Sequence, residues 1–209
     1  MELIAPSGVP RGAVLVIHSW WGLTASFSKY GSMLADAGFL VGLTDLFEGR
    51  TAKTEAEARA LRARPRRTPM YKTLGEDLAS LAAATGSAAT RLGVVGFSMG
   101  GHWAVWLSQR PEYSLGATVL YYSARAGEFS NCRSSIIAHF AEHDPWVSVS
   151  ARKRMENAIR KSQCDYSAYD YPGTKHWFAE AARPSEFDES AARLALDRDV
   201  THLASNLDP

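Results

Sequence analysis

Short runs of apolar and β-branched residues alternate with longer amphipathic stretches along most of this chain. Several of the short runs are nearly continuous in Val, Ile, Leu and Ala, which is typical of strands buried on both faces. The pattern predicts strands at residues 13–19, 39–47, 91–97, 116–123, 134–142 and 165–172.

The longer stretches between these runs have helical periodicity. Between the first two strands, apolar side chains recur at helical spacing at Phe27, Tyr30, Leu34 and Ala37, and Gly38 is suited to end a helix there. Further helices are expected around residues 71–84, 99–109, 149–161 and 188–205. This alternation predicts a mostly parallel, doubly wound α/β sheet flanked by helices, in a single domain over residues 1–209.

Residues 48–69 depart from the pattern. They are polar and alanine-rich, then strongly basic at Arg62, Arg64, Arg66 and Arg67. Because Pro65 and Pro69 interrupt any helix there, we expect a solvent-exposed surface excursion. The alternative is a positive rim that attracts a substrate carboxylate or another anion.

Composition narrows the possible partners. With 209 residues, 46% of them hydrophobic and 22% charged, the chain has the make-up of a globular protein with one sizeable core. A net charge of +1 provides no general attraction to nucleic acid or anionic membranes. The start of the chain does not resemble a signal peptide, and no apolar segment approaches the ~20 residues that span a bilayer. We therefore expect a cytoplasmic monomer or homodimer that binds neither nucleic acid nor membrane.

Two cysteines, Cys132 and Cys164, occur without the spacing of a metal site. In a reducing compartment they are expected to remain free thiols.

Candidate chemistry begins at the sequence Gly96-Phe97-Ser98-Met99-Gly100, which fits the pattern G-x-S-x-G. A buried strand is predicted before it and a helix after it. This is the setting in which the pattern forms a sharp turn that exposes the serine as a nucleophile. A serine hydroxyl also needs a neighbouring base to accept its proton.

A base and an acid follow in the expected order. Asp144 comes directly after strand 134–142, and His176 comes after strand 165–172. Both lie at the carboxyl ends of their strands, the edge at which Ser98 is expected. We therefore predict Ser98 as nucleophile, His176 as general base and Asp144 as the carboxylate that orients it. The N–H groups of Met99 and Trp20 are the predicted oxyanion donors.

Other titratable residues fit these roles less well. Asp45 precedes the serine in the chain, and Asp165 and Asp170 belong to the last predicted strand. Among the remaining histidines, we expect His102 and His139 to be packing residues, His143 a pocket wall, and His202 part of the final helix.

With these residues placed, the chain resembles the dienelactone hydrolase family of α/β-hydrolases along nearly its whole length. The similarity is carried by "VLVIHSWWGLTASFSKYGSMLADAGFLVGLTDLF", "GVVGFSMGG", "EHDPWV" and "YPGTKHWF". It implies an α/β-hydrolase fold, and it places the family's triad on Ser98, Asp144 and His176. The family's oxyanion donors fall on Trp20 and Met99.

Three positions differ from the members that cleave dienelactone. Those members have a cysteine at the position of Ser98 and a glutamate at the position of Ser19. They also have an arginine, which grips a substrate carboxylate, at the position of Glu180. The change at Glu180 argues against an anionic dienelactone as substrate, unless the arginines of residues 62–67 compensate.

The sequence therefore predicts a serine hydrolase for a small ester, lactone or thioester, acting through an acyl-enzyme without cofactor or metal. The expected pocket residues are Ser19, Trp21, Tyr122, Trp146, Trp177 and Phe178. Two alternatives stay open: a cofactor-free perhydrolase or acyltransferase with the same triad, and a non-catalytic ligand-binding protein that keeps the fold.

Overall fold

The middle of the central sheet is built from strands whose side chains are buried on both faces. The computed structural model describes residues 1–63, 67–85 and 91–207. Its strands are β1 (Glu2–Ile4), β2 (Ala13–Ile17), β3 (Leu40–Thr44), β4 (Leu92–Phe97), β5 (Leu115–Tyr121), β6 (Ser135–His143) and β7 (Tyr166–Lys175). Every residue of β2, β3, β4 and β5 is buried, as the continuous apolar runs predict.

The strand order is β1-β3-β2-β4-β5-β6-β7. All neighbouring pairs are parallel except β1 with β3, which is antiparallel. This order confirms the predicted doubly wound α/β fold. The edge strand β1 was not predicted, because three residues, two of them exposed, carry no periodic signal.

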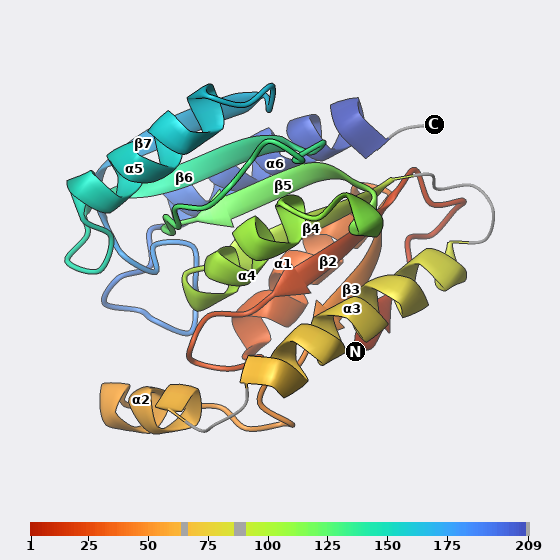
Figure 1. Ribbon diagram of the computed structural model, residues 1–209. Coiled ribbons are helices and arrows are strands. Elements are labelled where there is room, and N and C mark those ends of the chain that lie inside the picture. The colour runs from red at the N-terminus through yellow and green to blue at the C-terminus, as the bar shows by residue number, and fades with distance from the viewer. Residues whose placement is uncertain (64–66, 86–90, 208–209) are drawn as a thin grey trace.

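Helices cover the two faces of the sheet (Figure 1). Helices α1 (Ala25–Asp36) and α6 (Glu189–Leu207) pack on one face, and α3 (Arg67–Ala84), α4 (Met99–Ser108) and α5 (Val149–Arg160) pack on the other. The alternation along β2 separates the two cores: Val14 and Val16 join the first, and Leu15 and Ile17 join the second. A short 3-10 turn, η2 (Pro111–Tyr113), leads into β5.

The basic excursion contains a helix that the sequence did not predict. Helix α2 (Glu55–Ala63) lies beyond one end of the sheet (Figure 1), and its Ala58 is fully buried. Helix α3 begins at Arg67, so Pro69 falls in its first turn, where a missing N–H removes no intrahelical hydrogen bond. The predictions for Arg64, Pro65 and Arg66 lie outside the described residues.

Cys132 and Cys164 are free thiols whose sulfur atoms lie 2.8 Å apart. None of the helices in the described ranges combines the length and the apolar character that a membrane crossing requires.

A buried carboxylate joins α6 to the sheet and to α1. Asp199 accepts hydrogen bonds from the hydroxyl of Tyr30 at 2.8 Å and from the hydroxyl of Tyr121. It also pairs with Nε2 of His139 at 2.8 Å, and all of these side chains are buried. The expectation that His139 is a buried packing residue is thus confirmed. Burial and the charge of Asp199 hold the pKa of both tyrosines well above the ordinary value, so both remain donors.

We predict that Tyr30→Phe lowers the free energy of unfolding by about 1–3 kcal/mol, because a buried carboxylate loses one of its donors. Urea unfolding followed by circular dichroism measures the change. The matched control is Tyr113→Phe, whose hydroxyl has no hydrogen-bond partner within the described ranges and whose loss should cost less than about 0.5 kcal/mol. Equal stabilities of the two variants would contradict the role given to Asp199.

Candidate active site

A sharp strand-to-helix turn presents Ser98 at the end of β4. Its backbone adopts φ 52° and ψ −107°, a conformation that non-glycine residues rarely occupy. The turn can be this tight because two glycines remove obstacles. A side chain at Gly96 would overlap the backbone of Gly100, and one at Gly100 would overlap the carbonyl oxygen of Ile17. The N–H of Ser98 donates to the Tyr121 carbonyl at 3.0 Å, which fixes the turn on the sheet.

A continuous hydrogen-bond chain runs from this serine. Oγ of Ser98 lies 2.8 Å from Nε2 of His176, and Nδ1 of His176 lies 2.8 Å from Oδ2 of Asp144. Oδ1 of Asp144 accepts the N–H groups of Trp146 at 2.8 Å and Val147 at 3.0 Å. A carboxylate can only accept, so Nδ1 of His176 carries the proton. Nε2 is then free to accept the proton of the serine hydroxyl.

The sheet itself brings these groups together. Strands β6 and β7 are longer than β4, and the pair of His143 and Lys175 directly precedes Asp144 and His176. The side chains of His176 and Asp144 are only 3% and 6% exposed. The structure therefore places the three predicted residues in one hydrogen-bonded group, at the carboxyl edge of the sheet.

The loop of residues 18–22, which follows β2, lies beside Ser98. Nδ1–H of His18 donates to the carbonyl of Ser19 at 2.6 Å, and Nε2 of His18 accepts the N–H of Leu46 at 3.0 Å. Burial lowers the pKa of His18, which keeps the ring neutral as this pair of bonds requires. Within the described part of the chain, the N–H groups of Trp20 and Met99 donate to no other residue, so both are free to bind a ligand.

A pocket of about 170 Å³ opens over the serine. Its lining residues are Trp20, Arg62, Ser98, Met99, His102, Tyr122, Trp146, Val147, His176 and Trp177. This volume is below the roughly 300–1,000 Å³ of pockets that take drug-sized ligands. Trp20 packs against Trp146 and Trp177, with ring centroids 4.9 and 5.9 Å away.

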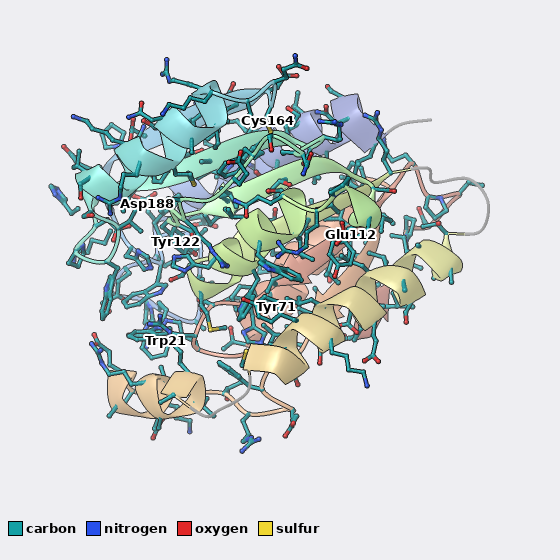
Figure 2. The ribbon with its side chains drawn as sticks, viewed as in Figure 1. Trp21, Tyr71, Glu112, Tyr122, Cys164 and Asp188 are labelled. Carbon is teal, nitrogen blue, oxygen red and sulfur yellow. The ribbon has the colours of Figure 1, made fainter. Side chains whose placement is uncertain are left out.

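Three residues predicted to line the pocket do not do so. Ser19, Trp21 and Phe178 are at most 1% exposed and lie behind the wall. Figure 2 shows Trp21 and Tyr122 at the end of the sheet that faces α2. The sequence grouped these side chains with their neighbours, but they lie in the loops and turns after β2 and β7, where tertiary packing sets the direction of each side chain.

Arg62 and His102 line the pocket. The sequence offered Arg62 only within the alternative of a positive rim, and it did not assign His102 to the site. His102 was expected to pack in the core, yet it is exposed at the pocket. Its spacing of one helical turn from Ser98 was the signal that could have placed it there. Arg62 belongs to α2, and Arg59 of the same helix lies 5.4 Å from the ring of Trp20 and 5.3 Å from that of Trp146. Arg62 lies at the pocket because of its place in helix α2, which the sequence did not predict.

The competing titratable residues lie elsewhere. His143 is exposed beside Glu142 and does not line the pocket, contrary to expectation. His202 is half-buried and bonds the Ser135 carbonyl at 3.1 Å. Asp170 pairs with Arg152. In the described ranges, no three His, Cys, Asp or Glu side chains cluster as metal ligands would.

Comparisons with known proteins bear on the family and the fold of this chain. The model of the dienelactone hydrolase family matches residues 2–207. Protein usf of Aquifex pyrophilus is 25% identical over 208 residues, covering 93% of this chain and 88% of that protein.

Two solved structures share the fold. A dienelactone hydrolase-like promiscuous phosphotriesterase from metagenomic libraries superposes with a TM-score of 0.84 at 18% identity, covering 96% of this chain and 89% of that one. Esterase PE8 superposes with a TM-score of 0.70 at 16% identity, covering 99% and 98%. At these identities the likeness shows the α/β-hydrolase fold alone.

The tight contact at the serine turn predicts a large cost for Gly100→Ala. The added methyl group would overlap the Ile17 carbonyl oxygen, so α4 must shift, and we expect a loss of about 2–3 kcal/mol in the free energy of unfolding. The matched control is Gly8→Ala, because an added methyl group there meets no atom within 4 Å. Urea unfolding of both variants measures the difference, and an unchanged Gly100→Ala protein would refute the close packing described for the turn.

Proposed function

Because this chain belongs to the dienelactone hydrolase family, we propose that it is a serine hydrolase. In this proposal it cleaves a small carboxylic ester, lactone or thioester through an acyl-enzyme intermediate. The observation that carries the proposal is the unbroken hydrogen-bond chain from Ser98 through His176 to Asp144. These three hydrogen-bonded residues supply a nucleophile, a base with a free lone pair and a buried orienting carboxylate.

In the first half of the reaction, Oγ of Ser98 attacks the substrate carbonyl carbon while Nε2 of His176 takes the hydroxyl proton. The carbonyl π electrons move to oxygen and give a tetrahedral oxyanion. The N–H groups of Trp20 and Met99 would bind this oxygen, because neither donates to another described residue. His176 then gives its proton to the leaving oxygen or sulfur as the bond to the acyl carbon breaks.

In the second half, a water molecule attacks the acyl-enzyme with His176 again acting as base. The bond between the acyl carbon and Oγ of Ser98 breaks, and the proton returns to the serine. The carboxylic acid product then leaves. Throughout both halves, Asp144 stabilises the imidazolium that forms at His176 and keeps its proton on Nδ1.

The size and lining of the pocket support a small substrate. About 170 Å³ accommodates a short acyl group or a small ring, and Trp20, Tyr122, Trp146 and Trp177 give the pocket aromatic walls. Arg62 and His102 add polar groups to the pocket that can contact a bound substrate.

We predict that Ser98→Ala lowers kcat/KM for p-nitrophenyl acetate by roughly 10³-fold or more, because the acyl group has no attachment point. The control, Ser32→Ala, removes an exposed hydroxyl on α1 whose one partner among the described residues is the Ser28 carbonyl, and it should retain wild-type turnover. Turnover by Ser98→Ala at the wild-type rate would remove Ser98 from the mechanism.

We also predict that Asp144→Asn lowers kcat by about 10³–10⁴-fold without unfolding the protein. An amide in place of the carboxylate donates to Nδ1, which moves the imidazole proton to Nε2 and removes the base. Asp170→Asn makes the same chemical change at an exposed carboxylate paired with Arg152 and should leave kcat within about twofold. Similar kcat values for the two variants would show that Asp144 has no special part in the reaction.

A further inference from the structure

A second buried carboxylate lies next to the catalytic group but takes no part in the steps above. Glu180 is 1% exposed, four residues after His176, and its backbone N–H donates to the Trp177 carbonyl at 2.9 Å. Its Oε2 accepts the hydroxyl of Ser19 at 2.8 Å, and its Oε1 accepts the hydroxyl of Tyr122 at 2.9 Å. One carboxylate thus joins two segments that are distant in sequence.

Each of these two hydroxyls belongs to a part of the candidate site. Ser19 directly precedes Trp20, and Oγ of Ser19 also accepts the N–H of Trp21 at 3.4 Å. The Ser19 side chain is therefore bonded to the residue that follows Trp20, which holds the Trp20 peptide in place. Tyr122 lines the pocket, and its ring centroid lies 4.8 Å from that of His176. The carboxylate therefore contacts the 18–22 loop through one oxygen and the wall beside the imidazole through the other.

We propose that Glu180 is a positioning residue of this site: its ionised carboxylate, held by Ser19 and Tyr122, fixes both the Trp20 N–H and the wall beside His176. The inference rests on the proposed serine-hydrolase function and adds to it the residue that aligns its oxyanion donor. Glu180 is buried behind the pocket wall, so it acts through these two partners rather than on the substrate.

The two donated hydroxyl bonds match the ionised form of Glu180. A carboxylate accepts with both oxygens, whereas a carboxylic acid accepts with one and must donate with the other. Protonation of Glu180 therefore makes either Ser19 or Tyr122 turn its hydroxyl and accept instead of donate, which changes the bond that holds that segment.

The surroundings make this protonation relevant near neutral pH. The titratable and charged groups that face Glu180 are Tyr122 at the end of β5 and, from its own loop, Arg183 and Glu186, with His176 beyond the Tyr122 ring. Burial raises the pKa of Glu180 to about 7, while the hydroxyls of Ser19 and Tyr122 and the charge of Arg183 act in the opposite direction. Such a carboxylate costs stability when ionised, which is common where function requires a charge.

The sign of the stability effect follows from the raised pKa. Folding favours the protonated form, so wild-type stability falls as pH rises from the ordinary carboxyl range to about 7, where Glu180 ionises. Glu180→Gln has no charge to bury, so the variant should be at least as stable as wild type at alkaline pH. A glutamine also accepts with one atom and donates with the other, which makes this variant a mimic of the protonated state.

The test compares the kcat of wild type and Glu180→Gln for p-nitrophenyl acetate between about pH 5.5 and pH 8.5. We expect wild type to be about tenfold faster at the alkaline end and the ratio to approach one at the acid end, with KM changed less than about threefold. The acid limb of the kcat profile of Ser19→Ala should lie at higher pH than that of wild type, because the Ser19 hydroxyl lowers the pKa of Glu180.

Tyr30→Phe serves as the matched control, since it removes a hydroxyl donated to the other buried carboxylate, Asp199, and should leave the profile unchanged. A pH-independent ratio, or equal kcat values at all pH, would overturn the inference while wild-type turnover still supports the proposed function. Wild type without turnover would overturn the proposed function and the inference with it. Urea unfolding at the alkaline end shows whether a slow Glu180→Gln protein is folded.

Discussion

A 2.8 Å hydrogen bond between Ser98 and His176 joins positions 78 residues apart, and the rest of the site depends on it. It forms because the serine turn follows β4 while the imidazole follows β7, three strands away in the sheet. The greater length of β6 and β7 carries Asp144 and His176 past the end of β4, where their loops can reach the serine. Because the strands are parallel, all three segments end at the same edge of the sheet. The fold therefore brings these positions together whatever side chains they carry.

Several features at this edge are unfavourable for stability and are compensated elsewhere. Ser98 and Trp177 have positive φ, and Glu180 is a carboxylate buried beside the proposed catalytic group. These features persist because two apolar cores and the Asp199 network hold the sheet and helices around them. Strain at the serine turn with a buried carboxylate beside it is what is expected where a protein has been shaped for chemistry.

The sequence predicts what local pattern determines, and the structure adds what tertiary packing determines. Six strands and the glycine-flanked turn follow from composition and periodicity, and the family resemblance is confirmed by the match over residues 2–207. Phe178 and Trp21 were misplaced because the direction of a loop side chain depends on packing that no periodicity shows. The place of Arg62 at the pocket could not be predicted without the register of α2. The hydrogen bond between Glu180 and Ser19 joins residues 161 positions apart, and no local signal indicates it.

The most direct test of the central claim is the intact mass of the protein after treatment with a fluorophosphonate, followed by peptide mapping. An activated serine attacks phosphorus and expels fluoride, which leaves a stable phosphonyl ester on its oxygen. The account predicts one adduct per chain, located on Ser98 and lost when His176 is replaced by alanine. An unmodified wild-type protein, or an adduct on another residue, would contradict it.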